Sequence, residues 1–428
     1  MEFTLRALIQ DSLANFLRDK VVFWKQRSKI RRIQAFDENT KFFHAHASHK
    51  FRKNSIRSLL VDGCQVFDHD FKAAALFNYF SSTLGVSKQR RWNFSLHDLY
   101  PTSEGLFNSV WQDISGPFTI QEAKAAVDSM NFNSAPGPDG FGPSFYRTSW
   151  QQIQPSIQRL LQEFFDHTAQ LERLNRAYIV LIHKPGKLNA PDCYRPISLQ
   201  NCHIKILAKI LATRLQTMLD RLIDWEQTGF MKGRSISKTF LYATELLQCC
   251  QKRKTPTTII KLDFAKAFDS VQWPSLQAIL IARNFPVSWQ RWVSDILSTS
   301  KSAVLLNGIP GKWINCKQGL RQGDPLSPYL FILVADVLQK LIKKCGLIKH
   351  PLVAYSPVAT LQYADDTLII CQADPAQLLL LKSLLDDFAA ATGLSINFSK
   401  STLVTLHTSG EDSQAMANIL QCKLDGLT

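Results

Sequence analysis

Two adjacent carboxylates, Asp365 and Asp366, stand between two short β-prone runs, residues 359–362 and 367–370. Apolar and β-branched runs on both sides of a short polar segment are typical of a hairpin, so we expect these acids at its tip. Asp263 follows a third run of this kind, residues 258–262. An antiparallel sheet that contains these strands would bring the three carboxylates together.

The chemistry of these acids predicts a metal site. Converging carboxylates repel one another unless cations lie between them. Ligand sets made only of oxygen favour Mg²⁺ over Zn²⁺, and two such ions about 3.5–4 Å apart catalyse in-line displacement at phosphorus. The acids therefore predict nucleotidyl transfer with two Mg²⁺ ions, for which Mn²⁺ can substitute.

The composition indicates a protein with a large core and an acidic partner. The chain has 428 residues, of which 45% are hydrophobic, and a formal net charge of +15. It can therefore bury a large core in one multi-lobed unit or in two to three domains. The positive charge predicts an acidic partner, and nucleic acid is the commonest one, with a membrane surface as the alternative.

The expected location is intracellular, in the nucleus or the cytoplasm, and not secreted. The N-terminus lacks the layout of a signal peptide, and no apolar run approaches the roughly 18 residues that a spanning helix needs. The nine cysteines are scattered and odd in number, which fits reduced thiols.

Residues 1–60 carry thirteen basic side chains against five acidic ones. Interleaved aromatics predict a helical arm that follows a phosphate backbone and stacks on bases. An amphipathic helix packed on the main body explains the same pattern, and the basic run 25–32 also resembles a nuclear-import patch. The aromatics concerned are Trp24, Phe36, Phe42, Phe43 and Phe51.

Further along the chain, helical and β-prone patterns alternate. Thr119 and Glu122 form a capping box that predicts a helix start, and Gly393 is placed to end one. Helices are expected over residues 203–223, 273–283, 327–344 and 376–392, and strands over 178–182, 194–199 and, as a pair, within 302–319. The apolar stripe of 203–223 is expected in the core. This order predicts an α+β fold with helices on one face of an antiparallel sheet.

Six stretches, in this order, resemble the reverse transcriptases of LINE-type (non-LTR) retrotransposons, most closely those of plants. A lone Y-x-D-D is usually a polar turn, but the shared order of all six identifies the family. The resemblance extends over roughly residues 20–405. The stretches are 134–140 (SAPGPDG), 181–199 with 229–234 (GFMKGR), 262–271 (LDFAKAFDSV), 319–326 (GLRQGDPL), 362–366 (QYADD) and 393–400 (GLSINFSK).

The resemblance implies the fingers and palm of a right-hand polymerase, with the acids on an antiparallel palm sheet. Only 28 residues follow Lys400, so we expect the thumb to be missing or incomplete and the chain to be truncated. The implied segments are a basic helical connector at 1–115, the fingers at 116–255, the palm at 256–410 and a truncated tail at 411–428.

The family also implies roles for the acidic residues and their neighbours. Asp263 and Asp365 would hold both metal ions, Asp366 would assist, and the backbone carbonyl of Phe264 would complete the metal shell. Phe268 would clash with a 2′-hydroxyl and so select deoxynucleotides, which disfavours an RNA polymerase. Core packing is the alternative explanation for a phenylalanine at this position.

Other contacts follow from the same resemblance. Gln322 and Gly323 would border the nucleotide and the template, and the loop 134–140 would contact the template. Lys400 would protonate the departing pyrophosphate, with a solvated surface lysine as the alternative. The residues implied to hold the triphosphate from the fingers are Lys184, Lys187 and Arg195.

The sequence thus predicts an RNA-directed DNA polymerase. It would join dNTPs to the 3′-hydroxyl of a DNA primer on an RNA template, without a membrane partner. The alternative is a catalytically inactive, nucleic-acid-binding remnant of such an element. Incorporation that depends on Asp365 would distinguish the two.

Overall fold

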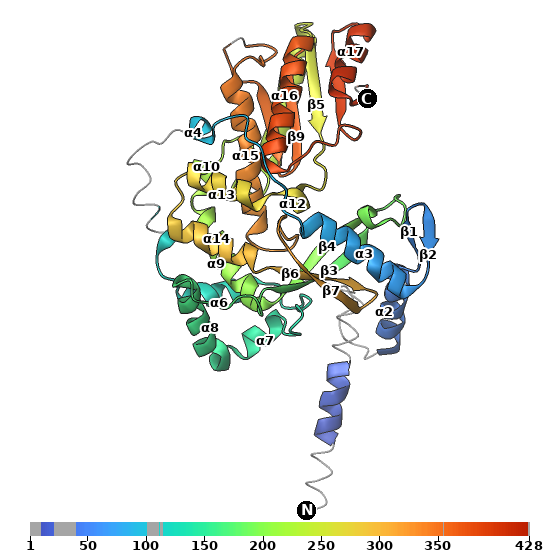
Figure 1. The fold of residues 1–428 in the computed structure, drawn as a ribbon, viewed down its shortest axis with the longest axis vertical. Helices are drawn as coiled ribbons and strands as arrows, with labels where there is room; N and C mark the ends of the chain where they lie inside the picture. Colours follow the sequence, from blue (N-terminus) through green and yellow to red (C-terminus); the bar gives the residue numbers. More distant parts are fainter. Residues whose placement is uncertain (1–9, 21–39, 101–110, 112–113, 354, 427–428) are drawn as a thin grey trace, which may run out of the picture. The chain divides into compact units, whose positions relative to one another are not determined.

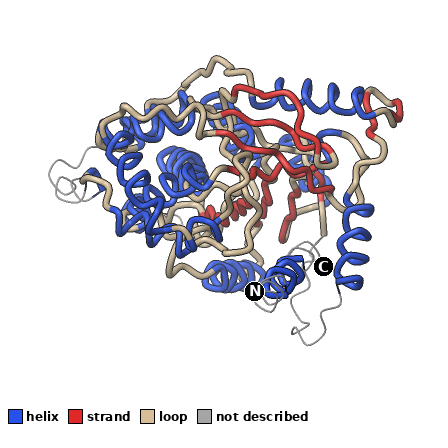
Figure 2. Tube along the Cα trace, turned by 90° about the horizontal axis from the view of Figure 1, so that it is seen from below, coloured by secondary structure: helices blue, strands red, loops and turns tan. Residues whose placement is uncertain are grey.

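The computed structural model describes residues 10–20, 40–100, 111, 114–353 and 355–426, and they form two compact units. Unit 1 comprises Met1–Leu76, Val180–Pro196 and Leu305–Gly311. Unit 2 comprises Phe77–Ile179, Ile197–Val304 and Lys312–Thr428. Helices and strands occur in both (Figures 1 and 2), so the predicted α+β class is confirmed. The four functional segments implied by the resemblance stay predictions.

Unit 2 contains a five-stranded sheet with the order β11-β10-β5-β9-β8. All its pairs are antiparallel except β10 with β11. The predicted strand 258–262 and the predicted acidic hairpin are therefore confirmed and are neighbours in one sheet. The strands are β5 (Thr257–Leu262), β8 (Ala359–Tyr363), β9 (Asp366–Gln372), β10 (Thr402–Leu406) and β11 (Lys423–Leu424).

One face of this sheet packs into the main core. Ile260, Leu262 and Ile369 point to this side, because alternate residues of a strand face opposite ways. Helices supply the other half of this core, and α16 and α17 lie beside β5 and β9 in Figure 1. The helices concerned are α13 (Trp273–Ala282), α15 (Ser327–Cys345), α16 (Pro375–Thr392) and α17 (Gly410–Leu420).

The opposite face is also covered, but only in part. Ile259, Leu361 and Ile370 pack there with Ala243 and Leu246 of α11 (Ile236–Lys252). The prediction of helices on one face only is therefore wrong, since the apolar side chains of the second face need cover as well. Toward the acidic end this face is open, because the side chains of Lys261 and Asp366 are 64% and 68% exposed.

Most predicted helices and caps are confirmed. Thr119 forms the expected capping box with Glu122 at the start of α6, and Gly393 ends α16 with a φ of +89°. The predicted helix 203–223 is shorter than expected, because it ends at Gln216 and a separate short helix follows, but its apolar stripe is buried as predicted. Further helices are α2 (Thr40–Asn54), α3 (His69–Leu84), α4 (Leu96–Leu99), α6 (Ile120–Ser129), α7 (Pro143–Thr148), α8 (Trp150–Phe165), α9 (Cys202–Gln216), α10 (Leu219–Leu222), α12 (Ala267–Ser270) and α14 (Val287–Ser298), with a 3₁₀ turn at Pro191–Cys193.

A second sheet has the order β4-β3-β6-β7. Asn307 and Gly308 join β6 to β7 as a two-residue turn, with φ values of +53° and +93°. A separate two-stranded hairpin lies in unit 1. These strands are β3 (Arg176–His183), β4 (Tyr194–Gln200), β6 (Lys301–Leu306) and β7 (Ile309–Asn315), and β1 (Leu59–Val61) with β2 (Cys64–Val66).

Helix α2 carries part of the predicted N-terminal arm. Phe43 and Ala47 are buried, whereas Phe42 and Phe51 are exposed, so the helix is amphipathic. Trp24, Phe36 and the basic run 25–32 lie outside the described residues. Within the described ranges no helix is long and apolar enough to cross a lipid bilayer, and the nine cysteines are free thiols.

Candidate active site

The register of the five-stranded sheet brings the three acids to one end of it. Leu262 pairs with Thr367, so Asp263 continues β5 to a position opposite Asp366. Tyr363 pairs with Asp366, which leaves Ala364 and Asp365 as a two-residue turn between β8 and β9. Asp365 and Asp366 are exposed, and Asp263 is half-buried.

The backbone of Asp263 is held by the segment that follows α16. The Asp263 N–H donates to Ser401 Oγ at 3.1 Å, and the Asp263 carbonyl accepts from the Asn397 N–H at 2.7 Å. Next to it, Phe264 forms an antiparallel bridge with Ile396, and its ring is buried in the core. Residues 396–401 therefore hold the backbone of Asp263, and the metal role of the Phe264 carbonyl stays a prediction.

The donor set suits a hard cation. Lys261 Nζ lies 4.0 Å from Asp366 Oδ1, so a cationic group already stands beside this carboxylate. Both partners are solvated, which makes such a pair weak and easily displaced. Among the described residues, no three side chains of the metal-ligating types are grouped closely enough to hold an ion. The all-oxygen chemistry of the three aspartates nonetheless fits Mg²⁺.

The acidic turn has an unusual backbone. Ala364 has a φ of +57°, a left-handed conformation that residues with a Cβ rarely adopt. Gly229 lies against it, since a Cβ built on Gly229 would be 2.2 Å from the Ala364 nitrogen. The neighbouring Gln227 forms a parallel bridge with Gln362 of β8. Sequence reasoning assigned no role to either residue; Gly229 begins the GFMKGR stretch and Gln227 lies two positions before it, which was the one available signal.

Ionic contacts anchor the segment that precedes Gln227. Asp224 accepts from Lys340 Nζ at 2.6 Å and from Lys343 Nζ at 2.8 Å, and Lys343 Nζ also contacts Glu226 at 2.6 Å. Burial raises the pKa of Asp224, but the hydrogen bonds from the two lysines outweigh burial, so this pKa lies below its ordinary value. Both lysines belong to α15, so this helix ties the segment to the core.

Two more of the predicted residues lie on stretches that contact each other. The Leu320 N–H donates to the Phe268 carbonyl at 2.7 Å, which joins stretch 262–271 to stretch 319–326. The half-buried Phe268 ring stacks on Phe331 with centroids 4.7 Å apart and an interplanar angle of 14°. Gln322 accepts from the Ser198 N–H through its backbone carbonyl at 2.9 Å. The backbone of Phe268 is thus tied to stretch 319–326, and its ring rests on the buried ring of Phe331.

Gly323 and Asp324 complete that turn. Gly323 is exposed and has a φ of +101°, a conformation that favours glycine. Asp324, which sequence reasoning missed, is buried. Its Oδ1 accepts from the Leu326 and Ser327 N–H groups at 2.8 and 2.9 Å, and its Oδ2 accepts from Gln200 Nε2 at 2.9 Å. Asp324 is thus a buried cap for the start of α15.

The predicted basic residues fall in different units. Lys184, Lys187 and Arg195 belong to unit 1, where Lys184 Nζ donates to the Asp192 carbonyl at 3.1 Å and Arg195 is exposed. Lys400 belongs to unit 2 and is exposed, and its backbone N–H donates to the Asn397 carbonyl at 3.0 Å. The segment that carries Lys400 is therefore the one that anchors Asp263. The roles of all four residues stay predictions.

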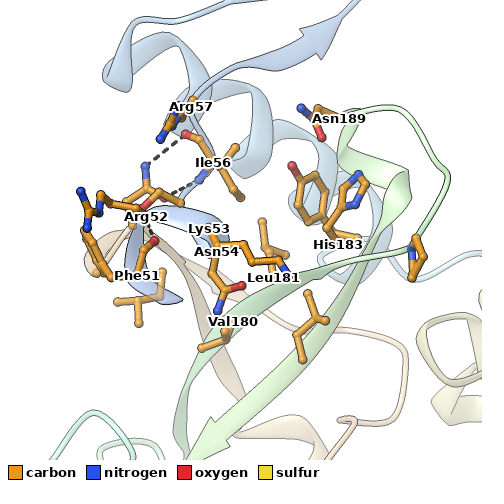
Figure 3. A pocket seen from close by; sticks show the side chains of 17 residues that line it. Phe51, Arg52, Lys53, Asn54, Ile56, Arg57, Val180, Leu181, His183 and Asn189 are labelled. Atoms are coloured by element: carbon orange, nitrogen blue, oxygen red, sulfur yellow. Dashed lines mark hydrogen bonds between the residues drawn. The ribbon is translucent and has the colours of Figure 1, made fainter. Parts of the chain in front are cut away.

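Unit 1 contains a cavity of about 940 Å³ at the C-terminal end of α2 (Figure 3). Arg52, Lys53 and Arg57 line it together with His183 and Tyr194, and none of its lining residues is acidic. The loop after α2 is held in place, because Asn307 Oδ1 accepts from the Ile56 N–H at 2.8 Å and Asn307 Nδ2 donates to the Ile56 carbonyl at 3.1 Å. The cavity combines cations with aromatic rings.

Comparison with known proteins agrees with the predicted resemblance. The family model described as "Reverse transcriptase (RNA-dependent DNA polymerase)" matches residues 182–420. An uncharacterized 149 kDa protein of transposon TX1 from Xenopus laevis is 26% identical over 383 residues, which are 88% of this chain and 29% of the relative.

Two further relatives are Pol polyproteins of R2 retrotransposable elements. The Nasonia vitripennis protein, from a type-1 element, is 28% identical over 271 residues, 63% of this chain and 25% of its own length. The Drosophila melanogaster protein, from the type-2 element R2DM, is 29% identical over 287 residues, 66% of this chain and 26% of its own length. The chain thus spans less than a third of each of the three relatives. Because the family model covers more than half of it, the chain belongs to the reverse transcriptase (RNA-dependent DNA polymerase) family.

Proposed function

We propose that this chain is the RNA-directed DNA polymerase domain of a LINE-type retrotransposon, which extends a DNA primer along an RNA template with dNTPs. The observation that carries this proposal is the strand register that sets Asp263 opposite Asp366, beside the Asp365 turn. In this proposal the five-stranded sheet is the palm, and the four-stranded sheet with its basic loop belongs to the fingers. The closer likeness to plant elements stays a prediction.

Asp263, Asp365 and Asp366 would hold two divalent cations, Mg²⁺ or Mn²⁺, through their carboxylate oxygens. When bound, such ions would lower the pKa of the primer 3′-hydroxyl and neutralise the charge that develops on the leaving pyrophosphate. Asp263 would contribute from a fixed backbone, because Ser401 and Asn397 hold it on both sides. Lys400, on the same segment, would donate a proton to the pyrophosphate.

Phe268 would select the sugar of the incoming nucleotide. Its ring stacks on Phe331, and a ring that cannot move aside would exclude a 2′-hydroxyl. Gln322 and Gly323 would lie along the nucleotide and the template. The exposed glycine, which has no side chain, would let a nucleotide approach the backbone closely.

The family resemblance assigns the contacts to phosphate to basic side chains. Lys184, Lys187 and Arg195 would bind the triphosphate, Arg195 through its planar, two-pronged guanidinium. The basic cavity at the end of α2 would bind template RNA, since cations beside aromatic rings suit a single strand. Binding of this kind weakens steeply as the salt concentration rises.

The test is primer extension on an RNA template with Mg²⁺ and dNTPs. We expect Asp365→Asn to reduce incorporation about 1,000-fold or more, because a lost metal ligand removes roughly 4 kcal/mol of transition-state stabilisation. The matched control is Asp62→Asn, which changes an exposed aspartate in the turn of the β1–β2 hairpin, and it should leave incorporation unchanged. Salt-sensitive RNA binding by the wild type without any incorporation would instead indicate a non-catalytic binding protein.

A further inference from the structure

The backbone of the acidic turn needs support from outside the hairpin. Ala364 is only 6% exposed, so its N–H and carbonyl groups need hydrogen-bond partners within the protein. Its left-handed φ of +57° also strains a residue that carries a Cβ. Since Asp365 directly follows Ala364, any change in this backbone would redirect the Asp365 carboxylate.

Gln227 supplies the missing partners from a single side chain. It is fully buried, and its Oε1 accepts from the Ala364 N–H at 3.0 Å. Its Nε2 donates to the Ala364 carbonyl at 3.4 Å. A side-chain amide has one acceptor and two donors, so it can pair with both polar groups of one residue.

We propose that Gln227 is the positioning residue of the acidic turn: it fixes the left-handed backbone of Ala364 and thereby the direction of the Asp365 carboxylate. The consequence for catalysis rests on the function proposed above, whereas the consequence for the backbone does not. Gln227 itself touches neither metal nor nucleotide in this proposal.

Backbone hydrogen bonds to β8 hold the residues on both sides of Gln227. The Thr228 N–H donates to the Gln362 carbonyl at 2.9 Å, and the Gln362 N–H donates to the Glu226 carbonyl at 2.9 Å. Residues 226–228 thus extend along β8, the edge strand of the sheet. Gln227 Oε1 also accepts from the Gly229 N–H at 2.9 Å, which orients the amide.

Side-chain contacts from Arg234 and Lys343 also hold this segment. Arg234 donates to the Ile223 carbonyl at 2.8 Å and to the Gln227 carbonyl at 2.9 Å. Glu226 contacts Lys343 of α15 at 2.6 Å. The backbone of Gln227 is therefore held on both sides along the chain, which keeps the base of its side chain beside Ala364.

Hydrogen exchange of the whole chain tests the backbone part of the proposal. In Gln227→Leu, the amides of residues 365–368 should exchange at least about 10-fold faster, because the turn opens more often. Gln227→Asn keeps an amide but is shorter by one methylene, so it should act in the same direction. It serves as the test variant if the leucine variant does not fold.

The matched control is Gln339→Leu. Gln339 is also fully buried and donates to a carbonyl of β8, that of Thr360, at 3.4 Å, but it does not contact the turn. Exchange at residues 365–368 should stay within about twofold of wild type in this variant. Equal exchange at these amides in the Gln227 variants and wild type would overturn the proposal, as would equal acceleration by Gln339→Leu.

Primer extension and Mn²⁺ binding test the consequence for the acids. Gln227→Asn should lower kcat about 10-fold or more and weaken Mn²⁺ binding about threefold or more, with the Kd for primer–template within about twofold. An unchanged kcat in an active preparation would overturn the positioning role. If the wild type incorporates nothing, the proposed function fails, while hydrogen exchange and Mn²⁺ binding still decide the role of Gln227.

Discussion

The two hairpin turns that join β6 to β7 and β8 to β9 obtain their shape in opposite ways. Asn307 and Gly308 both tolerate positive φ, and Asn307 supports another segment by binding both polar groups of Ile56. Ala364 does not favour its φ and instead receives support from Gln227, 137 positions away. A turn that only connects strands can be built from its own residues, whereas the turn that carries the acids depends on distant ones.

The largest expected change in stability comes from a methyl group added at Gly229, beside the acidic turn, compared with one added at Gly308, within the other turn. A Cβ at Gly229 would stand 2.2 Å from the Ala364 nitrogen, so Gly229→Ala should lower the free energy of unfolding by about 3 kcal/mol. Gly308→Ala meets nothing within 4 Å and should cost only about 1 kcal/mol, from its positive φ. Urea unfolding measures both. Similar losses of unfolding free energy in the two variants would mean that the backbone of the acidic turn can shift to accommodate the added methyl group.

A smaller effect tests the strain at Ala364 directly. Ala364→Gly should raise the free energy of unfolding by about 0.5–1 kcal/mol, because glycine adopts positive φ freely. The gain should be larger by about 0.5 kcal/mol in a Gln227→Leu background, since the two residues contact each other.

The control for that substitution is Ala359→Gly in β8, the strand that precedes the turn, at a buried position without a positive φ. It should destabilise the protein by about 0.5–1 kcal/mol in urea unfolding. Additive effects of Ala364→Gly and Gln227→Leu would show that Gln227 does not hold the strained backbone.

A further effect, no larger than the last, concerns the pH dependence of the segment that precedes Gln227. The lowered pKa of Asp224 contributes stability that is present above its ordinary value of about 3.9 and is lost as the pH falls below it. Between pH 5 and 3, Asp224→Asn should therefore lose less unfolding free energy than wild type, by up to about 1 kcal/mol.

The Asn307 contact offers the comparison for that titration, because neither Asn307 nor the Ile56 backbone ionises in this range. Asn307→Ala should lower the free energy of unfolding by the same amount at pH 5 and pH 3. Parallel pH profiles for wild type and Asp224→Asn would contradict the assigned role of Asp224 in anchoring the segment behind the acidic turn.

Sequence reasoning succeeded where local patterns decide the structure. The acidic hairpin, the strand before Asp263 and the Thr119 cap follow from side-chain alternation and from short-range hydrogen bonds. The break after Gln216 was not predicted, because the apolar stripe continues through it.

The features that sequence reasoning missed depend on contacts between distant residues. Cover of the second sheet face by α11 depends on packing, which no periodicity within that helix reveals. Gln227 and Gly229 depend on the φ of Ala364, which is not expected for an alanine. In the sequence Asp324 is typical of a polar turn, and only its hydrogen-bond partners in the structure reveal that it is a buried cap.

The contacts of residues 226–229 also mean that the acidic hairpin is not a portable module. A synthetic peptide that spans only β8 and β9 would contain Asp365 and Asp366 but would lack the groups that set the angle between them. A designer who transplants this hairpin into a foreign scaffold would have to bring the second segment along as well.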